Sequence, residues 1–241
     1  MSVSLRQSLR IGSYLMRQKL SGNKKFPLLV ELEPLFACNL KCAGCGKIQQ
    51  PHTLLKQRMP VEQALGAIEE CGAPMVSIAG GEPLMHPQID VLGDLNDDLG
   101  IDEMQISPAY AYEKAPDQEH FLGVTETREL FRKAFADGRR KKWRLNHTPL
   151  FLDFLEGKTD FGCTAWGIPS YSLLGWQKPC YLMNDGYVKT YKELVETTDW
   201  DSYGRGKDPR CANCMAHCGY EPSAVLATMG SLRETIRAAR G

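Results

Sequence analysis

The stretch Cys38-Asn39-Leu40-Lys41-Cys42-Ala43-Gly44-Cys45 decides the fold, because it carries three thiols at a C-x3-C-x2-C spacing. Directly before it, Leu28-Leu29-Val30-Glu31-Leu32-Glu33 is typical of a short, largely buried strand. Thiolate is the soft ligand that iron–sulfur clusters require, and each of three thiolates can bind one iron of a four-iron cluster. The fourth iron then stays open, so the loop predicts a cluster that binds a substrate as well as carrying electrons.

A structural zinc knuckle is the alternative for this loop. Zinc sites of that kind need four ligands, and His52 is the nearest candidate for the fourth. A second motif favours the cluster: the predicted strand Met75-Val76-Ser77-Ile78-Ala79 runs directly into Gly80-Gly81-Glu82-Pro83. Glycine has no side chain, so its backbone can approach a ligand closely.

The composition indicates an ordinary globular protein of 241 residues. The formal net charge is zero, which argues against general nucleic-acid binding. No apolar run reaches the length of a membrane span, and no signal peptide is visible. Nine cysteines without a secretion signal predict a reducing cytoplasm with metal-bound thiols in place of disulfides.

Residues 1–25 are expected to form a basic amphipathic helix that ends near Ser21-Gly22-Asn23. Such a helix could attach to the anionic inner face of a membrane. It could equally pack its apolar face on the domain and leave the basic face in water, and that is the arrangement we expect. The basic residues are Arg6, Arg10, Arg17, Lys19, Lys24 and Lys25, and the apolar stripe is Leu5, Leu9, Gly12, Met16 and Leu20.

The segment from Pro60 to Cys71 has apolar residues at helical spacing, so strand, cysteine loop, helix and strand form one βαβ unit. Cys71 falls at the end of that unit away from the strand C-termini, and is expected to be a buried small residue. Further helices are predicted over Thr125–Phe135 and Phe151–Leu155.

The last third of the chain carries a second set of thiols. They are Cys163, Cys180, Cys211, Cys214 and Cys218, and the last three have a C-x2-C-x3-C spacing. This set could bind a second iron–sulfur cluster, hold a structural zinc ion, or consist of buried thiols without a metal. The best ligand set is the first four residues, with Cys218 as a substitute, and His217 beside it is expected to be incidental.

The two motifs resemble the signatures of the radical S-adenosylmethionine (radical SAM) superfamily, and the C-terminal cysteines resemble its half-length "twitch" auxiliary-cluster domain. The resemblance implies that Cys38, Cys42 and Cys45 are the only protein ligands of a [4Fe-4S] cluster. It also implies that Gly80, Gly81, Glu82 and Pro83 contact the amino group of SAM, which chelates the open iron. Ile106 and Ser107, on a later strand, are expected near the adenosine.

Longer strings resemble the hopanoid-biosynthesis radical SAM proteins, the adenosylhopane synthases. The resemblance implies that the 5′-deoxyadenosyl radical of SAM adds to the terminal alkene of hopene, with an electron donor such as flavodoxin or ferredoxin. No catalytic residue beyond the cluster ligands is assigned. The strings are residues 32–36, 42–48, 76–84, 106–113, 142–144 and 176–182. The alternatives are a radical SAM enzyme that modifies a peptide or another small molecule, and a non-catalytic iron–sulfur fragment.

A radical SAM barrel has about six βα units, each on the order of 30 residues. From His86 to Leu99 the sequence indicates only one short helix, and the next strand is Glu103–Pro108. The middle of the barrel is therefore expected to be missing, with a junction near Ile89 to Leu92. After it, Tyr110 and Tyr112 either line a substrate pocket or cap the barrel.

The predicted fold class is α/β, a partial (β/α)6 radical SAM barrel with a C-terminal cysteine-rich extension. The expected domains are the N-terminal helix at 1–25, the incomplete barrel at 26–150, and the auxiliary domain at 151–241.

Overall fold

The structure, a computed structural model, describes residues 5–38, 45, 49–81, 86–87, 107–108, 110–111, 115, 118–119, 121–141, 147–183 and 185–240. Cys42, Glu82, Pro83 and Ile106 lie outside these residues, as do Tyr112 and most of the expected strand Glu103–Pro108. In chain order the elements are α1 (Leu5–Leu20), β1 (Leu29–Glu33), α2 (His52–Leu55), α3 (Val61–Cys71), β2 (Met75–Ile78), α5 (Val124–Lys141), α6 (Pro149–Glu156), η4 (Ala165–Gly167), β3 (Ser170–Ser172), β4 (Gly175–Gln177), β5 (Tyr187–Val188), α7 (Tyr191–Thr197), η5 (Trp200–Ser202), η6 (Pro209–Cys211), α8 (His217–Met229) and α9 (Leu232–Arg240).

The described strands form one mixed sheet in the order β2-β1-β3-β4-β5. β1 pairs in parallel with β2 and with β3, whereas β3, β4 and β5 pair antiparallel. The predicted βαβ unit is therefore present, with α3 as the crossover between β1 and β2. Because β1 and β3 are neighbours, the sheet joins the segment expected as the barrel to the segment expected as the auxiliary domain.

The main hydrophobic core extends from α3 through this sheet to the C-terminal third of the chain, where it includes Trp200 and Cys218. Val30 and Leu32 of β1 are almost fully buried, and Trp176 of β4 is fully buried. The indole nitrogen of Trp176 donates a hydrogen bond to the carboxylate of Glu70 on α3 at 3.0 Å. This bond links α3 to strand β4. Cys71 is buried in this core, as its position in the sequence predicts.

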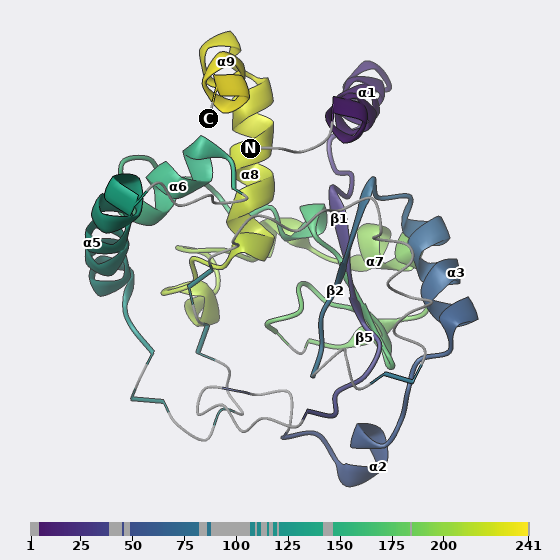
Figure 1. Cartoon of the computed structure of the whole chain (residues 1–241). Helices are drawn as coiled ribbons and strands as arrows, with labels where there is room; N and C mark the ends of the chain where they lie inside the picture. The colour runs from purple at the N-terminus through teal and green to yellow at the C-terminus, as the bar shows by residue number, and fades with distance from the viewer. Residues whose placement is uncertain are drawn as a thin grey trace.

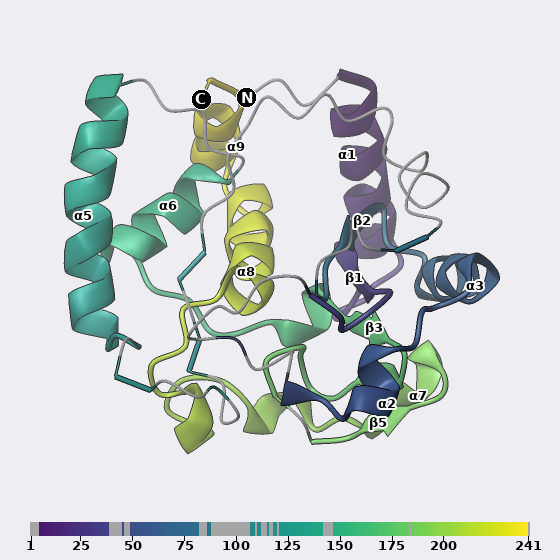
Figure 2. The ribbon, with the colours of Figure 1, turned by 60° about the horizontal axis from the view of Figure 1, so that its bottom comes forward.

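A second core joins α5, α6 and α8. Phe151 and Phe154 of α6 are fully buried, and the ring of Phe154 stacks on Tyr220 of α8 at a centroid distance of 4.5 Å. α6 begins where the Thr148 hydroxyl accepts a hydrogen bond from the amide of Phe151, an N-cap that satisfies one otherwise unpaired donor. α8 lies between the sheet with α3 and the α5–α6 pair (Figures 1 and 2).

The N-terminal helix forms where the sequence predicts it, but the expected direction of its apolar stripe is wrong. Leu15 is buried against α8 with Ile11 and Tyr14 beside it, whereas Met16 and Leu20 are 56% and 81% exposed. The inward face thus comes from residues off the predicted stripe, because these residues pack against Val225, Leu226 and Met229 of α8. No helix among the described residues is long and apolar enough to cross a bilayer.

Candidate functional site

The first candidate site lies where β1 and β2 end side by side. Cys38 follows β1 by five residues and Cys45 completes the motif; both are half-buried, and Cys42 lies outside the described residues. The amide of Gly81 donates to the carbonyl of Leu35 at 3.0 Å, and the Ala79 amide donates to the Leu32 carbonyl at 2.7 Å. The end of β2 is therefore fastened to the segment that leads into the cysteine loop.

Gly80 and Gly81 are required by this close approach. A Cβ atom on Gly81 would lie 1.9 Å from the carbonyl oxygen of Ala37, and one on Gly80 would lie 2.4 Å from that of Leu35. Gly80 also has a φ of 114°, which side chains disfavour. From the sequence, these glycines are expected to let a ligand approach the backbone closely. The structure shows a second reason for them: they leave room for the backbone of the segment just before Cys38.

The second candidate site is a pocket that all five C-terminal cysteines line together. It has about 400 Å³ of empty space, open solvent included, and among the described residues no Asp, Glu, His, Lys or Arg lines it. The cysteines come from separate segments: the loop before η4, the loop after β4, the turn around η6, and the start of α8. The lining residues are Tyr110, Cys163, Ala165, Pro179, Cys180, Leu182, Met183, Tyr203, Gly204, Cys211, Cys214, Cys218, Gly219 and Tyr220.

Cys163 reaches this pocket through space that a glycine leaves. A Cβ atom on Gly219 would lie 2.5 Å from the sulfur of Cys163, and one on Gly204 would lie 3.2 Å from the Cys163 Cβ. Gly219 sits in the first turn of α8 directly after Cys218. The absence of a side chain there lets Cys163 and Cys218 face the same cavity.

The pocket disfavours thiolates unless a cation is present. Burial, together with the nearby thiols of Cys214 and Cys211, raises the pKa of Cys163 to about 12. Burial likewise raises the pKa of Cys214 to about 11, and it raises those of Cys180, Cys211 and Cys218 above their ordinary value. A coordinated metal reverses this effect, because a thiol bound to a metal ion is deprotonated.

The two kinds of metal centre considered for these thiols place different demands on their arrangement. Among the described residues, no group of three or more His, Cys, Asp or Glu side chains is placed to hold one metal ion. A structural zinc ion needs four ligands that converge on one point at about 2.3 Å. In an iron–sulfur cluster each thiolate binds a different iron, so the ligands surround a larger body. The five cysteines line one cavity together.

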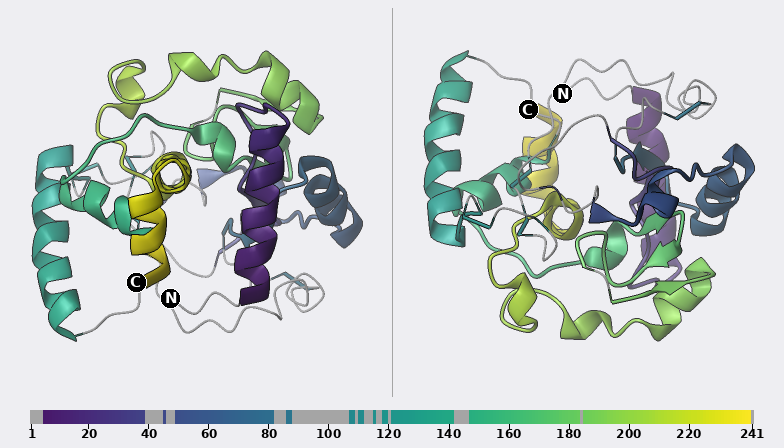
Figure 3. Two further views of the ribbon diagram at one scale, coloured as in Figure 1. Left: turned by 90° about the horizontal axis from the view of Figure 1, so that it is seen from above. Right: turned by 90° about the horizontal axis from the view of Figure 1, so that it is seen from below.

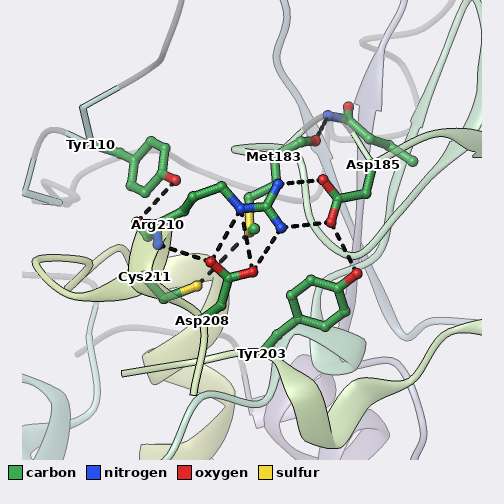
Figure 4. A network of polar contacts seen from close by, with 8 residues as sticks. Tyr110, Met183, Asp185, Tyr203, Asp208, Arg210 and Cys211 are labelled. Carbon is green, nitrogen blue, oxygen red and sulfur yellow. Dashed lines mark hydrogen bonds and ion pairs between the residues drawn. The ribbon is translucent and has the colours of Figure 1, made fainter. Parts of the chain in front are cut away.

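A network of charged residues clamps two of the cysteine-bearing loops together (Figure 4). The guanidinium of Arg210 donates to the carboxylate of Asp185 at 2.8 Å and to that of Asp208 at 2.7 Å. The Tyr203 hydroxyl donates to Asp185 at 2.9 Å. The Arg210 hydrogen bond holds the pKa of Asp185 below its usual range. The clamp joins the loop that follows Cys180 to the residue before Cys211.

Three other residues singled out in the sequence lie near this pocket. Tyr110 lines it and donates from its hydroxyl to the Arg210 carbonyl at 3.3 Å. The Ser107 hydroxyl accepts from the amide of His217 at 3.2 Å, at the start of α8. His217 is not among the residues that line the pocket.

Sequence reasoning did not find the Arg210 clamp or the role of Gly219. The adjacency of Gly219 to Cys218 was the one available signal. The clamp has no local pattern, since Asp185 and Arg210 are 25 residues apart.

Two solved structures have a fold similar to that of this chain. A crystal structure of SuiB from Streptococcus suis aligns with a TM-score of 0.55 and 13% identity, over 91% of this chain and 78% of that chain. A structure of SuiB bound to S-adenosylmethionine aligns with a TM-score of 0.54 and 15% identity over the same shares. The chain thus shares the fold of an S-adenosylmethionine-binding protein.

The sequence itself identifies the family. The chain belongs to the family described as Domain of unknown function (DUF3463), which matches residues 104–238. That match takes in all five cysteines of the pocket. No curated protein sequence gives a significant match.

Proposed function

We propose that the protein is a radical SAM enzyme with two iron–sulfur clusters. The observation that carries the proposal is the meeting of the Cys38 segment with Gly80 and Gly81 at the ends of two parallel strands. Its support is the fold shared with SuiB, a structure of which contains S-adenosylmethionine. A [4Fe-4S] cluster held by Cys38, Cys42 and Cys45 would, once reduced by an electron donor, supply the one electron needed to cleave SAM into methionine and a 5′-deoxyadenosyl radical.

In this proposal Cys38, Cys42 and Cys45 bind three irons and leave the fourth for SAM. Gly80 to Pro83 contact the amino group of SAM, and Ile106 and Ser107 lie near its adenosine. A [4Fe-4S] cluster and SAM are the cofactors, and a flavodoxin or ferredoxin is the electron donor. The second cluster is held by thiols of the C-terminal pocket, whose burial keeps water from it.

Two substrate classes follow from different observations. The longer sequence strings favour adenosyl transfer to the terminal alkene of hopene. The comparisons support the wider alternative better, a radical SAM enzyme that modifies a peptide or another small molecule, because the solved structures that share the fold are of SuiB and no match is to a hopanoid enzyme.

The test is anaerobic reconstitution with iron and sulfide, then addition of SAM and dithionite and mass spectrometry of the adenosine products. We expect 5′-deoxyadenosine from the native chain and none from Cys42→Ala. Cys71→Ala, which removes a buried core thiol that does not line the C-terminal pocket, is the matched control. Wild-type yield from Cys42→Ala would show that the cluster assignment is wrong. With hopene added, an adenosyl adduct would establish the triterpenoid class, and free 5′-deoxyadenosine alone would show a competent radical site without assigning its substrate.

A further inference from the structure

Exposed apolar side chains gather on two helices of the protein. In the described part of the chain, seven large apolar side chains are exposed, and four of them lie on α1 and α9. Leu20 and Leu232 are 81% and 79% exposed, with Met16 and Ile236 beside them on the same helices. Single exposed apolar residues need no explanation, but a gathering of them marks an interaction surface.

Both helices lie along the same face of the molecule. They run roughly parallel at the top of Figure 1 and nearest the viewer in the left panel of Figure 3. α1 uses Leu15 and its neighbours to pack on α8, and α9 is held by the bond from the Thr235 hydroxyl to the Thr228 carbonyl at 2.9 Å. The inward face of α1 is thus satisfied within the protein, and the exposed apolar side chains of both helices are left for another surface.

The charge on this face is positive. No acidic residue occurs in the first 30 positions, and Glu31 is the first. On α9, the side chain of Arg233 is 92% exposed, and it lies 3.9 Å from the carboxylate of Glu234, which is only 17% exposed. The exposed basic residues of α1 and the loop after it are Arg10, Arg17, Lys19, Lys24 and Lys25.

We propose that α1 and α9 form a docking surface for an anionic lipid bilayer, with both helices lying in its plane. Apolar side chains flanked by lysine and arginine suit that environment, because the apolar groups enter the acyl boundary while the basic groups contact lipid phosphates. Charge complementarity selects the bilayer over a second copy of this chain, whose own face would be equally basic. The proposal is independent of the reaction catalysed and of the clusters.

The test is co-sedimentation of the whole chain with vesicles of phosphatidylcholine alone or mixed equally with phosphatidylglycerol. We expect binding to the mixed vesicles that weakens as salt is added. Met16→Glu with Leu20→Glu, and separately Leu232→Glu, should each weaken binding at least about tenfold, since they remove apolar side chains that the bilayer buries. Leu174→Glu is the matched control, an exposed leucine in the turn between β3 and β4.

A second variant isolates the charge. Arg10→Gln, Arg17→Gln and Lys19→Gln together should abolish the preference for phosphatidylglycerol, with far-UV circular dichroism unchanged. Failure of the native chain to bind mixed vesicles, or equal binding by the helix variants and the Leu174→Glu control, would overturn the proposal. Self-association of the native chain in light scattering that the helix variants abolish, without vesicle binding, would assign the face to a second copy instead.

Discussion

At the scale of single residues, the sequence predicts which side chains carry the chemistry but not how they are brought together. The five C-terminal cysteines are recognisable from type and spacing, and the structure lines one pocket with all of them. Spacing along the chain could not show that Cys163 needs the missing side chain of Gly219, because the two are 56 positions apart in sequence and meet only in the folded core.

Gly219→Ala should therefore prevent metal binding at the C-terminal cysteine pocket and leave the first cluster unaffected. The new Cβ, 2.5 Å from the Cys163 sulfur, pushes that thiol out of the cavity, while alanine in place of glycine in α8 favours the helix by about 1 kcal/mol. We expect the second metal centre to be lost and the first retained, as measured by iron content and electron paramagnetic resonance. Gly162→Ala is the control, since a Cβ there meets nothing within 4 Å. Full second-site occupancy in Gly219→Ala would contradict this role.

At the scale of elements, the local sequence pattern was sufficient to predict a helix or strand where that element has a strong hydrophobic period or ends at a turn residue. β1, α3 and β2 form within a residue or two of their predicted ends, and α5 extends six residues beyond Phe135. The apolar stripe of α1 was misassigned because both sides of that helix carry apolar residues, and the surface of α8 decides which side is buried. Sequence periodicity carries no information about contacts with other helices, so it could not predict which side of α1 is buried.

Gly81→Ala should break the join between β2 and the cysteine loop. A Cβ placed 1.9 Å from the Ala37 carbonyl forces the backbone apart, at a cost of about 1–3 kcal/mol in unfolding free energy. We expect the first cluster and 5′-deoxyadenosine formation to be lost, while the C-terminal centre persists. Gly66→Ala, exposed on α3 with open space around its Cβ, should be neutral or stabilising. An active Gly81→Ala variant would show that the join does not position Cys38.

The Arg210 clamp predicts a pH-dependent stability. Asp185→Asn should lower the unfolding free energy of the metal-free chain by about 1 kcal/mol, a value suited to a partly exposed pair. Since the folded-state pKa of Asp185 lies below its usual value, this contribution is present above about pH 4 and is lost as the pH falls through the lowered pKa. Thermal unfolding of both proteins should differ equally from pH 8 to pH 5 and converge in acid. Asp199→Asn, whose exposed side chain makes no cap bond, is the control. A difference that persists in acid would assign the effect to something other than the carboxylate.

At the scale of the whole molecule, the sequence predicted an α/β protein, and the sheet and helices confirm that class. The six-unit barrel stays a prediction, because the residues around the expected junction at Ile89 to Leu92 lie outside the described ones. Pairing of β3 with β1 could not have been foreseen, since three-residue strands carry almost no periodic signal.

If the middle of the barrel is missing, the chain should be poorly stable and have little or no transferase activity. A radical site left open to solvent loses its radical to stray hydrogen donors. Inserting roughly 90 residues of barrel, about three βα units, between Ile89 and Asn96 should raise the unfolding temperature and restore adenosyl transfer. Cooperative unfolding and hopene-dependent transfer by the chain without the insertion would show that it is a complete, compact variant.

The most direct test of the two-cluster account is the iron and sulfide content after anaerobic reconstitution. The native chain should hold about eight iron atoms, and a Cys38→Ala, Cys42→Ala, Cys45→Ala variant about four, because each [4Fe-4S] cluster contributes four. Iron near four per chain in the triple variant, with matching sulfide, is the result that the C-terminal pocket predicts. Zinc in its place, or no metal at all in that variant, would contradict the account.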